Sequence, residues 1–186
     1  MWTPHLYSVT GLSAWGRKRL AMSTIGKHTS RHDSGLRFQR ILVAVDGSEG
    51  SAKASEIAVD LAENFNAQLY VIHAFRGYPE YMTVFPSAPS PSGEAIEAYE
   101  AYARKAALEV VGRTVSMAEK KGVKANPKTS ETIGSVVQTI TDYAVAEKVD
   151  LIVMGTRGMG GFKKMLLGSV SSGVVTHAHC PVLVVR

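Results

Sequence analysis

Short apolar runs alternate with longer helical patterns from residue 40 onward, and this alternation constrains the fold more than any other feature of the chain. Each run is apolar at nearly every position, which is typical of strands buried on both faces of a parallel sheet. The four clear runs cover residues 41–45, 69–74, 151–154 and 182–185. A weaker strand is predicted over residues 123–129, where Pro127 favours a position near the edge of the sheet.

Helical periodicity fills the segments between these runs. Helices are predicted over residues 51–64, 94–121, 135–148 and 170–177. The first helix can be capped at its N-terminus by Ser48 or by Ser51, because Ser is a preferred capping residue. The expected buried stripes of the first three helices are Ala54, Ile57, Ala58 and Leu61, then Leu108, Val111, Val115 and Ala118, then Val136, Val137, Ile140 and Ala144.

The alternation of strands and helices predicts a single α/β domain over residues 38–186. Its sheet is expected to be open and mostly parallel, with helices on both faces. No stretch approaches the roughly 18 consecutive apolar residues that a membrane-spanning helix needs, so no membrane partner is expected. The single cysteine, Cys180, excludes an intrachain disulfide framework, and a cytoplasmic location is expected.

Positive charge is concentrated in residues 1–40, which hold seven Lys or Arg residues and one acidic residue. Residues 41–186 hold fourteen basic and fifteen acidic residues, so no broad cationic face and no nucleic-acid partner are expected. Residues 1–37 also lack sustained periodicity, and we predict a disordered basic arm there. Two alternatives stay open for this arm: a true translation start at Met22, which leaves residues 1–21 upstream, and an organellar presequence.

Ligand chemistry in an open parallel sheet is expected beyond the carboxyl ends of the strands, where the strand order reverses. The segment after residues 151–154 is rich in glycine and runs to Gly168, just before the last predicted helix. Glycines let a ligand approach the backbone, and a helix N-terminus offers unpaired N–H groups with partial positive charge. Side chains nearby that add hydroxyl groups or positive charge are Ser169, Ser171, Arg157, Lys163 and Lys164. This combination predicts a site for the phosphates of a nucleotide.

Asp46 follows the first predicted strand and needs a different role, because a carboxylate repels a phosphate at contact distance. A carboxylate is better suited to a sugar hydroxyl, a base amine or a bridging metal ion. A helix cap is the alternative, since Asp is common at such turns. Both roles stay open at the level of the sequence.

Two common phosphate-binding motifs do not occur where a nucleotide fold would need them. The P-loop pattern Gly-x4-Gly-Lys-Ser/Thr is absent from the chain, and Gly-x-Gly-x-x-Gly does not follow the first predicted strand. The pattern that does occur is Gly155-x2-Gly158-x9-Gly168-Ser169, directly after a predicted strand.

This glycine pattern resembles the nucleotide motif of the universal stress protein family, and the resemblance extends over residues 40–186. It is supported by Val-Asp-Gly-Ser at 45–48, Leu-Ile-Val-Met-Gly at 151–155 and Cys-Pro-Val-Leu-Val-Val at 180–185. The resemblance implies a Rossmann-like sheet of five strands in the order 3-2-1-4-5, similar to the adenine nucleotide alpha hydrolases. It also implies a homodimer paired through residues 182–185, and binding of ATP, together with Mg²⁺.

The resemblance further implies roles for individual residues. Those that would line the adenosine pocket are Ala44, Asp46, Ala74, Met154 and Gly155. Those that would hold the phosphates are Arg157, Gly158, Gly168, Ser169, Val170 and Ser171. All of them fall at or just after the carboxyl ends of predicted strands, or at the start of the last predicted helix.

The function expected from these features is that of an ATP-binding regulatory homodimer in a stress response, whose nucleotide occupancy alters a surface read by an unidentified protein partner. No Ser-His-Asp or Cys-His arrangement can be argued from the chain, so no catalytic residue is assigned. Two alternatives stay open: a slow ATPase or autophosphorylating enzyme that uses the same pocket and modifies Ser169 or Ser171, and a ligand-free dimerisation module. A metal site at His177, His179 and Cys180 is less favoured than packing and helix-end charge.

Overall fold

The computed structural model of the chain describes residues 37–76, 92–132, 134–158 and 167–186. The predicted basic arm lies outside the described residues except for Arg37, and so do Lys163 and Lys164. The strands and helices below all belong to the described part of the chain.

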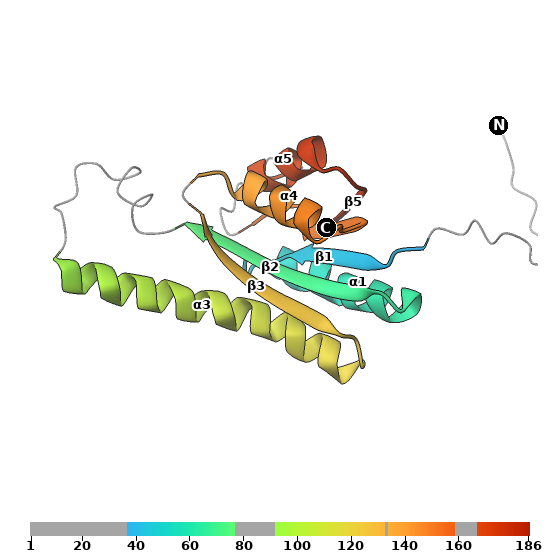
Figure 1. The fold of residues 1–186 in the computed structure, drawn as a ribbon, viewed down its shortest axis with the longest axis horizontal. Helices are drawn as coiled ribbons and strands as arrows, with labels where there is room; N and C mark the ends of the chain where they lie inside the picture. The colour runs from blue at the N-terminus through green and yellow to red at the C-terminus, as the bar shows by residue number, and fades with distance from the viewer. Residues whose placement is uncertain (1–36, 77–91, 133, 159–166) are drawn as a thin grey trace, which may run out of the picture. The chain divides into compact units, whose positions relative to one another are not determined.

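Five strands form one parallel sheet in the order β3-β2-β1-β4-β5 (Figure 1). The strands are β1 Arg40–Ala44, β2 Gln68–Arg76, β3 Ala125–Thr132, β4 Leu151–Gly155 and β5 Val182–Val185. Every neighbouring pair is parallel. The fold class and the strand order expected from the sequence are therefore confirmed.

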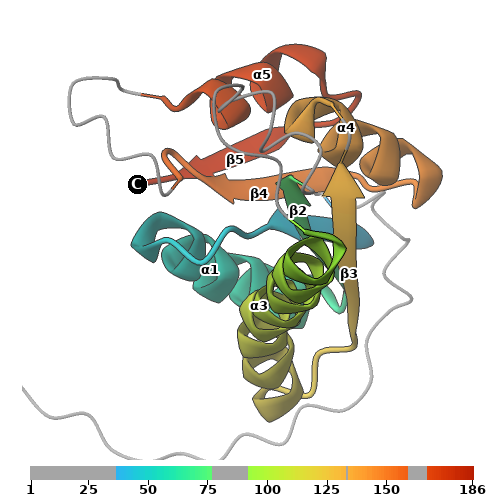
Figure 2. The same ribbon diagram turned by 90° about the vertical axis from the view of Figure 1, so that its left-hand side faces the viewer.

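Helices cover both faces of this sheet, two on each (Figure 2). The helices are α1 Glu49–Phe65, α3 Gly93–Lys120, α4 Val136–Ala146 and α5 Ser169–His177. Successive side chains of a strand point to opposite faces, so β1 contributes Ile41 and Val43 to the core under α1 and α3. Leu42 of the same strand packs in the core under α4 and α5.

The structure corrects the expected buried faces of α1 and α3. Ile57 is 37% exposed and Leu108 is 61% exposed, so both predictions of burial are wrong. The buried positions of the two helices are mostly small residues, namely Ala54, Ala58 and Ala62 in α1 and Ala107, Val111, Thr114 and Ala118 in α3. Small side chains let a helix lie close to its neighbours, and the Ser55 and Thr114 hydroxyl oxygens, 2.9 Å apart, form a buried hydrogen bond between α1 and α3.

Several elements begin or end at other residues than expected. β3 covers Ala125–Thr132 instead of 123–129 and pairs only with β2 among the described strands, so its predicted edge position is confirmed. An edge strand tolerates Pro127, because one side of its backbone makes no ladder hydrogen bonds. The last helix starts at Ser169, one residue earlier than predicted.

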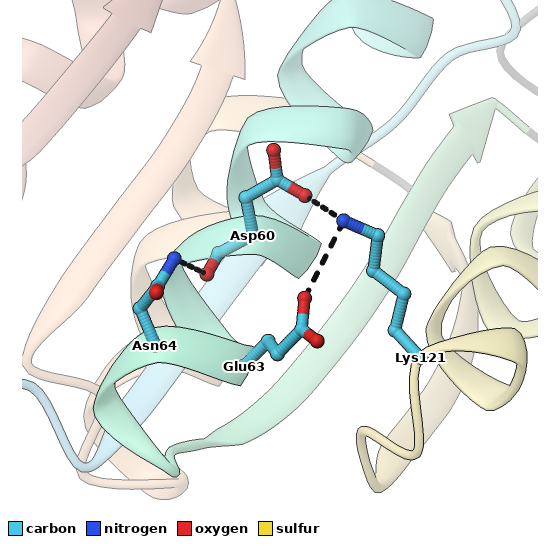
Figure 3. Close-up of polar contacts among 4 residues, drawn as sticks. All are labelled: Asp60, Glu63, Asn64 and Lys121. Carbon is cyan, nitrogen blue, oxygen red and sulfur yellow. Dashed lines mark hydrogen bonds and ion pairs between the residues drawn. The ribbon is translucent and has the colours of Figure 1, made fainter.

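Lys121, which follows α3, joins that helix to α1 on the surface (Figure 3). Its ammonium group contacts the Asp60 carboxylate and lies 3.4 Å from the Glu63 carboxylate. Asn64 donates a hydrogen bond of 2.7 Å to the Asp60 carbonyl oxygen. The hydrogen bond to Asp60 raises the pKa of Lys121. Such exposed ion pairs contribute little to stability, so the position of α1 depends mainly on its packing against the sheet.

Candidate functional site

A cavity of about 760 Å³ lies at the carboxyl ends of β1, β2 and β4. β1 lies between β2 and β4, so the strand order reverses at this point of the sheet. The volume falls in the range of cavities that hold small molecules and cofactors. The cavity therefore lies where a ligand site was expected.

The residues predicted for the adenosine pocket and for the phosphates all line this cavity. They are Ala44, Asp46, Ala74, Met154, Gly155, Arg157, Gly158, Gly168, Ser169, Val170 and Ser171. The structure thus brings together residues that are separated by more than one hundred positions in the chain. Their individual roles toward a nucleotide remain predictions.

Part of the lining was not predicted from the sequence. The residues that were not assigned to the site are Val45, Ser51, Ile72, Arg76, Val136 and Ile140. Ile72 and Arg76 lie two residues before and after Ala74 on β2, so all three point to the same face of the sheet. This period of two could have identified Ile72. Arg76 was missed because the strand was predicted to end at residue 74.

Asp46 holds the turn between β1 and α1. Its Oδ1 accepts a hydrogen bond of 3.0 Å from the Ser48 N–H and one of 2.6 Å from the Ser48 hydroxyl. The Ser48 Oγ in turn accepts from the Ser51 N–H at 3.2 Å, which makes Ser48 the N-cap of α1. The alternative that Asp46 itself caps the helix is therefore wrong. Asp46 positions the capping residue while it lines the cavity.

Gly158 lies against the Asp46 side chain. A Cβ atom at Gly158 would collide with Asp46 Oδ2. Any side chain at this position therefore forces the carboxylate to rotate. Glycine at 158 lets the segment after β4 and the carboxylate after β1 share the wall of one cavity.

Gly155, the last residue of β4, lies against the first turn of α1. A Cβ atom there would lie 2.8 Å from the Gly50 carbonyl carbon and 3.1 Å from the Ser51 nitrogen. These neighbours are backbone atoms, which cannot rotate away as a side chain can. Close packing of α1 on the sheet is thus a reason for this glycine that does not depend on any ligand.

The N-terminus of α5 differs from those of the other described helices. Ser48, Ser92 and Ser135 each cap their helix with a side-chain oxygen that accepts from a first-turn N–H. The N-cap of α5 is Gly168, which makes no such hydrogen bond. First-turn N–H groups have no partner within their own helix. The α5 N-terminus therefore presents N–H groups and partial positive charge to the cavity.

Ser169 and Ser171 have different environments. Ser169 is exposed at the start of α5, whereas Ser171 is only 3% exposed. The Ser171 hydroxyl donates to the carbonyl oxygens of Thr156, at 2.8 Å, and Gly168, at 3.0 Å. A hydroxyl has one hydrogen, so these contacts occupy the donor that the sequence analysis expected Ser171 to offer to a phosphate.

Among the described residues, Arg76 and Arg157 give the lining two guanidinium groups, and Asp46 gives it one carboxylate. Arg76 ends β2, and Arg157 lies two residues beyond β4. Because β2 and β4 flank β1, the two residues belong to segments on opposite sides of the central strand. This charge balance favours an anionic ligand.

The residues considered for a metal site make other contacts. His177 Nδ1 lies 2.8 Å from the Gly173 carbonyl oxygen, and His179 Nε2 lies 3.0 Å from the Val149 carbonyl oxygen. Burial raises the pKa of the Cys180 thiol, and the nearby charge of Asp150 raises it further. In the part of the chain that the structure describes, no three His, Cys, Asp or Glu side chains are grouped so that they could hold a metal ion. Within the same part, no helix is long and apolar enough to cross a membrane.

Comparisons with known proteins agree on one family. A sequence model described as the universal stress protein family matches residues 37–186. The universal stress protein YxiE of Bacillus subtilis is 36% identical over 149 residues, which are 80% of this chain and 99% of that protein. The solved structure of the universal stress protein UspA from Lactobacillus plantarum has a TM-score of 0.63 and 28% identity, covering 82% of this chain and 100% of that one. The solved structure of the universal stress protein from Archaeoglobus fulgidus in complex with dAMP has a TM-score of 0.56 and 22% identity. The match covers 81% of this chain and 100% of that one.

Proposed function

The chain belongs to the universal stress protein family, and from that premise we propose that it binds ATP, together with Mg²⁺, in the cavity at the carboxyl edge of the sheet. The proposal includes a regulatory role, in which the nucleotide-loaded homodimer presents a surface to a protein partner in a stress response. The observation that carries the proposal is the N-terminus of α5, which faces the cavity without a side-chain cap.

The phosphate end of the proposed site is built by α5 and the segment after β4. Gly168, Ser169 and Val170 line the cavity at the first turn of α5, where backbone N–H groups can donate to phosphate oxygens. Ser169 adds an exposed hydroxyl, and Arg157 adds a positive charge. Phosphates bind such helix termini through both hydrogen bonds and the helix dipole.

The adenosine end lies toward β2 and α4. Apolar side chains make this part of the wall, contributed by Ile72, Ala74, Val136, Ile140 and Met154. An adenine ring is flat and largely apolar on its faces, so such a wall suits it. Asp46 follows the central strand β1, between the two ends, where a carboxylate can accept hydrogen bonds from ribose hydroxyls.

The dAMP complex of the Archaeoglobus fulgidus protein supports an adenine ligand, because that protein has the same fold. At 22% identity the likeness concerns the fold alone. The choice of ATP for this chain therefore depends on its own cavity, in which the α5 N-terminus and Arg157 offer room and charge for more than one phosphate.

Mass spectrometry of gently purified protein tests the proposal. A tightly held nucleotide co-purifies, so native spectra are expected to show one adenine nucleotide per chain, which acid denaturation releases. Protein that carries no nucleotide, and takes none up when incubated with ATP and Mg²⁺, would contradict the proposal and favour a ligand-free dimerisation module.

A slow ATPase or autophosphorylating enzyme is the alternative use of the same pocket. The described lining offers one carboxylate, Asp46, which already accepts two hydrogen bonds from Ser48. The Ser171 hydroxyl is engaged with two carbonyl oxygens, so Ser169 is the better candidate for a phosphate acceptor. A single-turnover assay with labelled ATP separates the alternatives, since a regulator returns intact ATP and an enzyme returns ADP with free or protein-bound phosphate.

Asp46→Ala is expected to weaken ATP and adenosine binding alike, by about tenfold, the loss typical of a hydrogen bond to a charged group. Calorimetry with both ligands measures this. Ser48→Ala is the matched control, because it removes the hydroxyl hydrogen bond to Asp46, keeps the one from the Ser48 N–H, and leaves the carboxylate in the cavity. A loss confined to ATP with Mg²⁺ would assign Asp46 to the metal. Unchanged affinity for both ligands would leave Asp46 as a residue that only supports the turn.

The proposed homodimer uses the outer edge of β5, with which no other described strand pairs. The Pro181 carbonyl oxygen accepts a hydrogen bond of 3.0 Å from Ile152 of β4, and the Val185 carbonyl oxygen accepts one of 2.8 Å from Thr156, which follows β4. By alternation, the backbone of Val182 and Val184 faces away from β4. Leu183 is 38% exposed on this edge strand. An uncovered apolar edge invites pairing, and two-fold symmetry lets a second copy of β5 cover it in antiparallel fashion.

Val184→Pro is expected to convert the dimer to a folded monomer. Proline removes an N–H donor at the outer edge, while the ladder with β4, made by alternate residues, stays intact. Sedimentation of wild type and variant at tens of micromolar measures the change. A monomeric wild type would refute the dimer. A folded variant that still dimerises would show that the interface does not involve β5.

A further inference from the structure

Two backbone segments meet where α5 begins. Thr156 directly follows β4, and its carbonyl oxygen accepts a hydrogen bond of 2.7 Å from the Gly168 N–H. Thr156 also donates its own N–H to the Val185 carbonyl oxygen at 2.8 Å, which ties it to β5. Thr156 is thus fixed to the sheet, and Gly168 is fixed to Thr156.

Ser171 adds a side-chain link to the same junction. Its hydroxyl lies 2.8 Å from the Thr156 oxygen and 3.0 Å from the Gly168 oxygen, so its one hydrogen is shared between two carbonyl groups. The side chain is 3% exposed, which shields both contacts from water. The contact with Thr156 is the unusual one, because it leaves the helix and reaches the end of a strand.

Thr176 makes the ordinary hydrogen bond of a helical hydroxyl to a backbone carbonyl oxygen of its own helix. Its hydroxyl donates to the Ser172 carbonyl oxygen, one turn earlier in α5, at 2.9 Å. Such contacts within a helix are common and hold nothing outside it. Ser171 differs from Thr176 in the second acceptor, which belongs to the segment after β4.

We propose that Ser171 is a positioning residue that clamps the N-terminus of α5 to Thr156, and thereby holds the first-turn N–H groups in the geometry that phosphates require. Gly168 has no side chain to fix this terminus, so the clamp replaces the cap that Ser provides in the other described helices. This inference depends on the proposed ATP function. It predicts that Ser171 determines the preference for phosphorylated over unphosphorylated adenine ligands.

The test compares Ser171→Ala with Thr176→Ala and wild type, by calorimetry with ATP and with adenosine. Ser171→Ala is expected to weaken ATP binding about five- to tenfold, the range of one lost hydrogen bond, with adenosine affinity changed less than about twofold. Thr176→Ala is expected to change neither. A Ser171→Ala protein that binds ATP as wild type does, or loses ATP and adenosine affinity equally, would overturn the proposal.

Amide hydrogen exchange gives a second readout that needs no ligand. The Gly168 N–H is expected to exchange faster in Ser171→Ala than in wild type or Thr176→Ala, because the hydrogen bond to Thr156 opens more often. Unchanged exchange at Gly168 would refute the clamp. A wild type that binds no ATP would refute the proposed function instead, and the exchange rate would still decide whether Ser171 holds the junction.

Discussion

Gly168→Val is expected to weaken ATP binding at least tenfold, which corresponds to about 1.4 kcal/mol, while the protein still folds. Gly168 has φ −72° and ψ 164°, a conformation open to any residue, so the backbone is not strained by a side chain. A Cβ atom there meets Thr156 O at 3.4 Å and Ser171 Oγ at 3.7 Å, which are ordinary contacts. The two further methyl groups of valine have to enter the space beside the α5 N-terminus, where the phosphates are proposed to lie.

Gly112→Val is the matched control for this variant. Gly112 lies in α3 with nothing within 4 Å of a Cβ atom, so the same substitution adds the same groups away from the cavity. Calorimetry on both folded variants measures the effect. If Gly168→Val bound ATP as tightly as Gly112→Val does, the phosphates could not lie at the start of α5.

Gly155→Ala is expected to lower the free energy of unfolding by about 1–3 kcal/mol, the usual cost of overpacking a tight contact. The added Cβ would lie 2.8 Å from the Gly50 carbonyl carbon, so α1 has to move away from the end of β4. Urea denaturation followed by circular dichroism measures the loss. Ser51 lies in the first turn of α1 next to Gly50 and lines the cavity, so ligand affinity is expected to fall as well.

Gly158→Ala is the matched control for Gly155→Ala, because it adds the same methyl group beside the cavity but against a side chain instead of the backbone of α1. Its Cβ would meet the Asp46 carboxylate, which ends a side chain and can rotate, so the expected loss of stability is small. Equal stability of Gly155→Ala and wild type would show that α1 does not pack on Gly155 as tightly as the structure indicates.

The fold could be predicted because four of the five strands are short apolar runs and each connection between successive strands contains a helix. Parallel pairing follows from such connections, since a crossover must return the chain to the same end of the sheet. Many of the residues that line the cavity could be predicted for a related reason. Asp46 and Gly155 lie at or just beyond strand ends, Ala74 lies two residues before one, and parallel strands place those ends at one edge.

The buried faces of the helices were harder to predict. An apolar pattern assigns Ile57 and Leu108 to the core because they are large and apolar, yet both are exposed. The close packing of α1 and α3 selects small residues instead and buries a hydroxyl pair, Ser55 with Thr114. A pattern that counts only apolar residues cannot identify such a face, because the partner of Ser55 lies 59 residues away.

The role of Ser171 also depends on the tertiary structure. The sequence shows a hydroxyl near a helix start, which is equally suited to donate to a ligand or to the backbone. Its acceptor Thr156 lies 15 residues earlier and is brought close only when α5 packs beside the end of β4. The direction of the hydroxyl, and hence its assignment as a clamp, comes from that packing.

Calorimetric titration of nucleotide-free wild-type protein with ATP and Mg²⁺ tests the central claim most directly. The α5 N-terminus, Arg157 and the apolar wall around Ala74 form one cavity in each chain, so we predict saturable binding of one ATP per chain. Adenosine is expected to bind the same site more weakly, because it lacks the phosphates. Absence of binding at millimolar ATP, or binding that adenosine cannot compete with, would contradict the account.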